Sequence, residues 1–210
     1  MNKTKNKRNK KWLEYLIFGA IALVLYATGL HTEVIGFAQR GLLETGLMNP
    51  DVTETREMAQ ASTSGPESME EISEDPKANM NVQLRDPEGN IVSLSEFKGK
   101  VIFMNFWATW CPPCVAEMPA IDKLHEEMGD EVAFVMLSRD QNFDTAVAFK
   151  EKKDYGLPIY ELAGPLPAMY QSSALPTTFV IDAEGNLALT HKGMADYNTD
   201  EFKKFLNSLK

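Results

Sequence analysis

The chain has 210 residues, of which 44% are hydrophobic, enough for one domain or two small ones with a buried core. Its net charge is −9, and because the first eleven residues contain six Lys or Arg and no acid, the rest of the chain carries −15. The acidity of residues 12–210 argues against a nucleic-acid-binding protein, because such a protein needs a basic face. Two cysteines three positions apart are too few for a scaffold held by several disulfides, and the three histidines show no metal-ligand spacing relative to them.

The N-terminal segment is typical of a membrane anchor. Residues 1–11 form a basic head, and residues 12–32 are mainly apolar, with no formally charged residue from Tyr15 to Thr32. At about 1.5 Å per residue, a helix of this length spans the roughly 30 Å hydrocarbon core of a bilayer. The basic residues before the span predict a cytoplasmic head and an extracytoplasmic body, in a compartment where disulfides persist.

A cleaved signal peptide would also have a basic head and an apolar middle. The stretch Leu25-Tyr26-Ala27 is a poor cleavage site, and apolar residues continue as far as Ala38. We therefore favour an uncleaved transmembrane helix over a signal peptide. A lipoprotein anchor would need a cysteine, and this segment has none.

Residues 33–80 are interpreted as a juxtamembrane segment followed by a flexible acidic linker. In residues 33–48 the apolar side chains recur close to helical spacing, but three glycines weaken a helix there. A short interfacial helix and an irregular stretch therefore both stay open. Residues 51–80 are rich in Glu, Ser, Thr, Gly and Pro, a composition that buries too little apolar surface to offset its ordering entropy.

Residues 81–210 alternate between strand-like and helix-like patterns and predict one α/β domain. Continuous apolar runs indicate buried strands, and turn-forming runs around Gly89 and Gly185 indicate two hairpins. The expected elements, in chain order, are strands 82–84, 91–94 and 101–107, a helix 111–128, a strand 132–137, a helix 145–153, strands 178–181 and 187–190, and an amphipathic helix 199–209.

Both cysteines lie between a predicted buried strand and a predicted helix, in the run Phe106-Trp107-Ala108-Thr109-Trp110-Cys111-Pro112-Pro113-Cys114. This run resembles the active-site motif of thioredoxins. A second run, some sixty residues downstream, resembles the cis-proline loop of thioredoxins: Ala174-Leu175-Pro176-Thr177-Thr178-Phe179. Glu117 and Pro119 resemble the TlpA/ResA branch, whose members are membrane-tethered extracytoplasmic thioredoxins. The resemblance covers residues 81–210 and implies a thioredoxin-like fold, a central mixed sheet flanked by helices.

The residue types of this motif suit thiol–disulfide exchange. A helix start offers Cys111 the positive end of the helix dipole and free N–H groups, which lower the pKa of its thiol and make it the nucleophile. Cys114, one turn further, would then resolve the mixed disulfide that Cys111 forms with a target. Pro112 and Pro113 remove two N–H donors and so favour a reducing pair, although they also stiffen the turn. The alternative for the two cysteines is an inert structural disulfide.

The resemblance also implies a role for an acid. Glu117 lies three residues beyond Cys114 on the predicted helix and is similar to the TlpA/ResA glutamate that exchanges a proton with the second cysteine. Asn105 stands where many thioredoxins have a buried aspartate. We expect Glu117 to be buried with a raised pKa. The alternative is an ordinary solvated acid in the first turns of the helix.

Substrate contacts are implied in the same way. Pro176 is expected in cis, and Leu175, Pro176 and Thr177 are expected to bind an extended partner by strand-like hydrogen bonds. Trp110 is expected at the surface beside the cysteines, where it would touch partners, although a packing role is about as plausible. Trp107 is expected in the core.

Together these features predict a protein-disulfide reductase. Its partners would be disulfide-containing extracytoplasmic proteins, with apocytochromes before haem attachment as the targets that the family implies, and a membrane thiol donor that re-reduces the pair. No cofactor beyond the Cys111–Cys114 pair, no metal and no nucleic acid is expected.

Three alternative functions compete with this one. If the same residues catalysed the reaction in the reverse direction, the protein would be a disulfide oxidase or isomerase. A peroxiredoxin is disfavoured because its nucleophile follows a threonine by three positions, whereas Thr109 precedes Cys111 by two. Two thiolates suit Cu(I), but copper-delivery relatives of this fold have a wider cysteine spacing and a histidine ligand.

Overall fold

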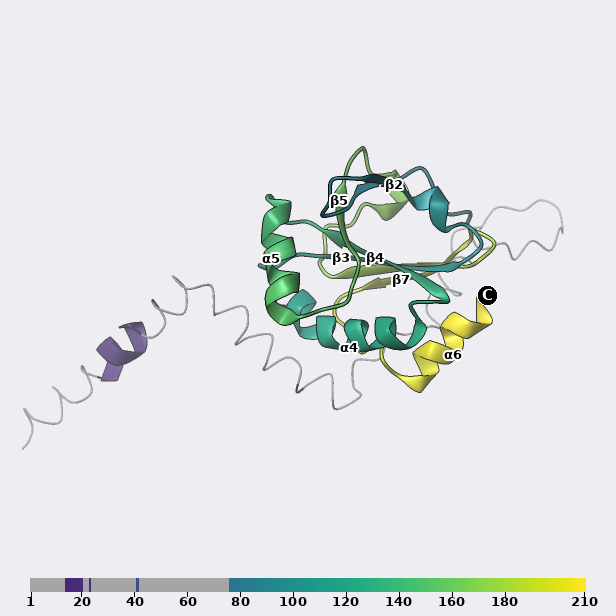
Figure 1. Cartoon of the computed structure of the whole chain (residues 1–210). Coiled ribbons are helices and arrows are strands. Elements are labelled where there is room, and N and C mark those ends of the chain that lie inside the picture. Colours follow the sequence, from purple (N-terminus) through teal and green to yellow (C-terminus); the bar gives the residue numbers. More distant parts are fainter. Residues whose placement is uncertain (1–13, 21–22, 24–40, 42–75) are drawn as a thin grey trace, which may run out of the picture.

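The computed structural model describes residues 14–20, 23, 41 and 76–210 (Figure 1). Residues 14–20 are helical, and within the described ranges no helix has the length and apolar character needed to cross a membrane. The predicted basic head, most of the predicted transmembrane span and the predicted linker up to residue 75 lie outside the described residues.

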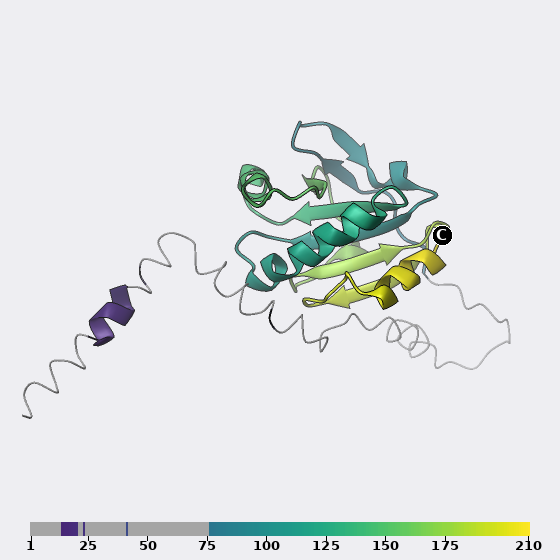
Figure 2. The same ribbon diagram turned by 60° about the horizontal axis from the view of Figure 1, so that its bottom comes forward.

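A seven-stranded mixed sheet forms the centre of the domain (Figures 1 and 2). Its strands are β1 (Gln83–Arg85), β2 (Ile91–Ser93), β3 (Val101–Trp107), β4 (Val132–Ser138), β5 (Ile159–Leu162), β6 (Thr177–Ile181) and β7 (Leu187–Lys192). Their order across the sheet is β2-β1-β5-β4-β3-β6-β7. β3 runs parallel to β4 and antiparallel to β6, so its C-terminal end lies beside the start of β6.

Helices cover one face of this sheet. They are α4 (Pro112–Met128), α5 (Phe143–Lys153) and α6 (Asp200–Ser208). Figure 2 shows α4 and α6 lying next to each other in front of the strands, where Lys203 and Glu127 join them by an ion pair of 2.6 Å. The opposite face is covered by two short 3-10 helices, η1 (Leu94–Phe97) and η2 (Ala168–Tyr170). The domain therefore has a hydrophobic cluster on each side of the sheet.

The position of β3 between the two hydrophobic clusters explains why its sequence is apolar at almost every position. Phe103 and Trp107 pack into the cluster beneath the α-helices, whereas Met104 and Phe106 pack into the cluster on the other face. A strand covered on both faces has no solvent side and therefore no polar alternation. Its one polar residue, Asn105, points to the helical side and is fully buried.

The strands and helices predicted from the sequence are all present, and their ends differ from the predicted ones by at most two residues. β5, η1 and η2 were not predicted. β5 has only four residues and pairs with β4 and β1 over two residues each, so its pattern is too short to distinguish it from a loop.

The packed domain begins earlier than the predicted boundary at Asn81. The N–H of Ala78 donates to the carbonyl of Gly185 at 2.9 Å, and the N–H of Leu187 donates to the carbonyl of Pro76 at 2.9 Å. Met80 packs against the cluster on the second face. Residues 76–80, which composition assigned to the linker, are thus held by backbone pairing that composition cannot reveal.

Candidate active site

The two cysteines form a disulfide at the beginning of α4, with their Cα atoms 5.3 Å apart. Cys111 is the N-cap residue of the helix, and its sulfur accepts a hydrogen bond from the N–H of Cys114 at 3.3 Å. Pro112 and Pro113 occupy the first two helical positions, which proline tolerates because N–H groups there have no helical partner. Cys114 is completely buried, whereas Cys111 keeps a small exposed fraction of 4%. This difference suits Cys111 as the sulfur that meets a partner first.

Asp140 holds the loop that leads to Cys111. Its carboxylate accepts hydrogen bonds from the Thr109 N–H at 3.1 Å, from the Thr109 hydroxyl at 2.7 Å and from the Ser138 hydroxyl at 2.9 Å. Asp140 follows β4, so the carboxyl end of that strand fixes the loop after β3. The sequence interpretation missed this residue, although a polar group directly after an apolar strand was a signal that could have drawn attention to it.

The two tryptophans near the motif have different environments. Trp107 is fully buried at the end of β3, and its ring lies 5.8 Å from that of Phe149 on α5, which confirms its expected place in the core. Trp110 directly precedes Cys111 and leaves 58% of its surface exposed. Trp110 therefore provides an apolar surface beside the disulfide, where the sequence placed it.

The loop before β6 contains the expected cis peptide bond, between Leu175 and Pro176. The carbonyl of Pro176 accepts a hydrogen bond from the Gly193 N–H at 2.9 Å, and the backbone of Thr177 belongs to β6. Among the residues that the structure describes, no hydrogen bond reaches the N–H or the carbonyl of Leu175. Of the three residues predicted to bind an extended partner, Leu175 is thus the one with unpaired backbone groups.

Glu117 is fully buried on α4, one turn after Cys114. Its Oε1 accepts a hydrogen bond from the Asn105 amide at 2.8 Å, and its Oε2 accepts one from the Ala195 N–H at 3.2 Å. Burial raises the pKa of Glu117 to about 8, although both hydrogen bonds act in the opposite direction. The expectation of a buried acid with a raised pKa is confirmed, and an ordinary solvated acid is excluded.

A buried chain of hydrogen bonds continues from Glu117 to the strands. Asn105 on β3 donates both to Glu117 and, at 2.9 Å, to the hydroxyl of Thr178 on β6, which also accepts from the hydroxyl of Tyr197 at 2.7 Å. Burial raises the pKa of Tyr197 well above its usual value, and the charge of Glu117 adds to this effect. Within the described part of the chain, Asn105 Oδ1 has no partner. The position of Asn105 beside Glu117 is suggested by the sequence motif, whereas the parts of Thr178 and Tyr197 in this chain emerge only from the fold.

This arrangement has the parts that thiol–disulfide exchange requires. A sulfur at a helix N-terminus can react as a thiolate, a second sulfur one turn away can displace it, and an acid with a pKa near 8 can exchange protons near neutral pH. Residues 73–209 match the Redoxin family. The family match therefore includes every residue of this site.

Three comparisons place the chain among known proteins. It is 31% identical over 144 residues to the thiol-disulfide oxidoreductase ResA of Bacillus cereus, an alignment that covers 68% of this chain and 82% of that protein. A DsbE-type thiol:disulfide interchange protein from Chlorobium tepidum has a similar structure, with a TM-score of 0.57, 25% identity and coverage of 66% of this chain and 99% of that one. The exposed lipoprotein thioredoxin of Streptococcus pneumoniae is 30% identical, with a TM-score of 0.52 and coverage of 60% and 98%. The chain therefore belongs to the Redoxin family, as a thioredoxin-like thiol–disulfide oxidoreductase of the ResA/TlpA type.

Proposed function

We propose that this oxidoreductase works as a reductase of protein disulfides outside the cytoplasmic membrane. The observation that carries the direction is the hydrogen bonding of Cys111. Within the described residues, the Cys114 N–H at 3.3 Å is the one donor to its sulfur, because Pro112 and Pro113 have no N–H to offer. A thiolate with few donors is stabilised little, so the reduced pair gives up its electrons readily.

The reaction begins with the reduced pair. The Cys111 thiolate attacks one sulfur of a target disulfide, and the other target sulfur leaves as a thiolate and takes up a proton. Glu117, as carboxylate, accepts the proton of Cys114, whose thiolate attacks the Cys111 sulfur and releases the second target thiolate. Two electrons pass to the target, and the Cys111–Cys114 disulfide remains. A membrane thiol donor would then return the pair to its reduced form.

The reduction potential tests this direction. Equilibration of the purified protein in glutathione buffers, followed by thiol alkylation, should give a value nearer to the −270 mV or so of thioredoxin than to the −120 mV or so of DsbA. Pro113→Ala restores an N–H near the sulfur and should make the pair more oxidising. A value around −130 mV would instead identify an oxidase, the alternative that the sequence leaves open.

The cellular setting is also part of the proposal. A basic head followed by an apolar stretch supports an N-terminal anchor with the domain on the extracytoplasmic side. Protein extracted from membranes should begin at Met1 or Asn2, and a mature start near residue 28 would mean that the segment is a cleaved signal.

Apocytochromes before haem attachment are the proposed targets, supported by the family resemblance alone. A Cys114→Ser variant cannot resolve the mixed disulfide and should retain them covalently on Cys111. Identification of the retained proteins tests the choice of targets independently of the direction of the reaction.

A further inference from the structure

A recess opens at the C-terminal end of β3, the end that leads to Cys111, and on the face of the sheet away from α4. It has a volume of about 430 Å³, and its walls include Phe106, Arg139, Leu166 and Leu175. Phe106 packs in the cluster on the second face, whereas both cysteines belong to the cluster beneath the helices. The recess therefore lies mainly on the other side of the sheet from the two sulfurs, and Leu175, which packs against both clusters, connects the two sides.

Its walls are nevertheless continuous with the loops that flank the disulfide. The N–H of Arg139 donates to the carbonyl of Trp107 at 2.8 Å, and the next residue, Asp140, holds the loop before Cys111. Leu175 on the opposite wall is joined to Pro176 by the cis bond. A partner chain that meets Cys111 and aligns with the unpaired backbone of Leu175 therefore passes along one wall of this recess.

The recess has a mixed lining with a single charge, and Tyr170, Gln171 and Ser172 are its uncharged polar residues. Phe106, Leu166 and Leu175 provide apolar surface, and Arg139 is the one charged residue among the described residues that line it. Arg139 is exposed, and no acid of the described part of the chain forms an ion pair with it. A guanidinium that is exposed and unpaired suits a carboxylate, which it can bind through two parallel hydrogen bonds.

We propose that this recess is a partner-binding subsite and that Arg139 selects protein segments carrying an acidic side chain close to the cysteine that Cys111 attacks. The inference rests on the proposed function, because it assigns a substrate class to the same disulfide exchange. Asp140, the next residue, directs its carboxylate to Thr109 and Ser138 and does not line the recess, so Arg139 makes the recess attractive to acidic rather than basic partner segments.

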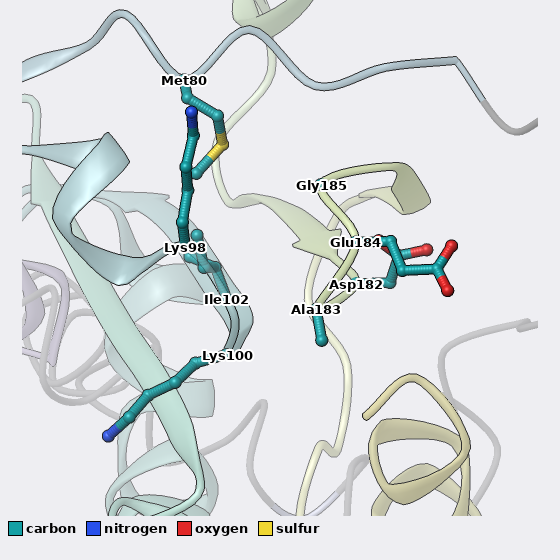
Figure 3. Close-up of a pocket in the computed structure, with 8 residues that line it drawn as sticks. All are labelled: Met80, Lys98, Lys100, Ile102, Asp182, Ala183, Glu184 and Gly185. Atoms are coloured by element: carbon teal, nitrogen blue, oxygen red, sulfur yellow. The ribbon is translucent and has the colours of Figure 1, made fainter.

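A matched control position exists at the other end of β3. The recess there, of about 210 Å³, lies between Ile102 and the turn that contains Asp182 and Glu184 (Figure 3). Figure 3 shows Lys98 across from these two acids. A change of Lys98 to Glu alters the net charge by the same amount as a change of Arg139 to Glu, but at the pole of the domain away from the disulfide.

Synthetic peptides with one cysteine, activated as a mixed disulfide with pyridine-2-thiol, provide the test. The Cys111 thiolate forms a disulfide with the peptide sulfur, and pyridine-2-thiol leaves with the electron pair of the broken bond. Glu is placed in turn at the three positions on each side of the cysteine and compared with Gln. At one or more positions we expect Glu to raise the second-order rate constant about threefold to fivefold, the factor that an exposed ion pair provides, and 1 M salt to abolish the difference.

The variants separate the outcomes. Arg139→Gln should lose the preference for Glu, Arg139→Glu should prefer Lys at the same position, and Lys98→Glu should keep the wild-type preference. A scan without any preference in the wild type, or a preference that Arg139→Glu leaves unchanged, would overturn the subsite. The neutral disulfide 2,2′-dithiodipyridine tests the chemistry itself. If the reduced wild type fails to react with it, the proposed function fails, whereas normal reaction without peptide preference refutes only the subsite.

Discussion

Glu117 experiences two opposing influences on its pKa. Removal from water favours the neutral acid, while donors on both carboxylate oxygens, from Asn105 and from the Ala195 N–H, favour the charged form. Burial dominates, and the pKa rises to about 8. The group is thus close to half-protonated under mildly alkaline conditions, as a residue that takes a proton from a thiol and returns it should be.

Replacement of Glu117 by Gln should separate the two steps of exchange. The mixed disulfide on Cys111 should form at the wild-type rate, because the helix terminus activates that sulfur. Its resolution should slow by about 10²–10⁴-fold, since Cys114 loses its proton acceptor. Stopped-flow measurement of both steps checks this, and resolution at the wild-type rate between about pH 6 and 8 would show that Glu117 has no part in it.

The same variant tests the raised pKa through stability. Between the usual pKa of 4.5 and about 8, the folded protein keeps a proton that the unfolded chain has lost. The stabilisation that comes from this retained proton is therefore complete below pH 4.5 and is lost as the pH rises through about 8. The free energy of unfolding changes by an amount on the order of 5 kcal/mol. In urea denaturation of the oxidised proteins, the free energy of unfolding of Glu117→Gln should fall less over this range than that of the wild type. Equal slopes would contradict the raised pKa.

Asn105 tunes this acid by donating to it. Asn105→Leu removes the donor at a similar volume, so the pKa of Glu117 should rise further and the pH profile of mixed-disulfide resolution should move to higher pH. Tyr197→Phe is the matched control, because it removes a hydrogen bond of the same buried chain that ends on Thr178 rather than on the carboxylate. If the two variants shift the profile equally, Asn105 has only a structural role.

The residues of this site differ in how far apart they lie along the chain, and this distance decides which of them can be predicted. Cys111, Cys114 and Glu117 lie within two turns of one helix, so their spacing places them close together, and the resemblance to the TlpA/ResA branch singles out Glu117. Thr178 meets Asn105 from β6, and Tyr197 donates to Thr178 from the loop after β7, both more than seventy residues after Asn105. Such a meeting depends on strand order, which local patterns do not specify.

The strands themselves were predictable wherever both faces of the sheet are covered. β3 and β4 are buried at all seven positions, and each run is apolar except for one polar residue, Asn105 or Ser138, which is typical of a strand covered on both faces. β5 is different because it has one buried residue followed by three partly buried ones. Short elements of this kind are determined by their neighbours, and β5 is positioned by β4 and β1.

Removal of the contact between Asp140 and the loop before Cys111 should lower the stability of the domain. Asp140→Ala leaves the N–H and hydroxyl of Thr109 without their acceptor, so the free energy of unfolding should fall by about 1–3 kcal/mol. Attack by Cys111 on 2,2′-dithiodipyridine should also slow, because its loop is less well fixed.

Glu161→Ala serves as the comparison for Asp140→Ala. It removes an exposed ion pair with Arg85 at 2.8 Å, worth about 0–1 kcal/mol, and lies away from the loop. If Asp140→Ala costs no more stability than Glu161→Ala and reacts as fast, the loop does not depend on Asp140.

The proposed tether and the disulfide lie at opposite ends of the domain. Pro76 and Ala78 pair with residues 185–187, beyond the C-terminal end of β6, whereas the disulfide lies at the end of β3 that adjoins the start of β6. A tether that enters there presents the disulfide away from the membrane. This orientation suits the reduction of extracytoplasmic targets, but re-reduction by a membrane thiol donor requires the domain to turn over.

The length of the proposed linker should therefore limit re-reduction. A flexible linker over residues 51–75, as their composition predicts, would have a root-mean-square reach of about 28 Å, of the same order as the diameter of a domain of this size. Deletion of residues 51–70 would shorten this reach to about 12 Å, and the Cys111–Cys114 pair should then accumulate in its disulfide form in cells, as alkylation of free thiols would reveal. The matched control replaces residues 51–70 by Gly and Ser at unchanged length and should stay as reduced as the wild type. If the deletion stays fully reduced as well, the donor reaches the disulfide without the domain turning over, and the linker has no such function.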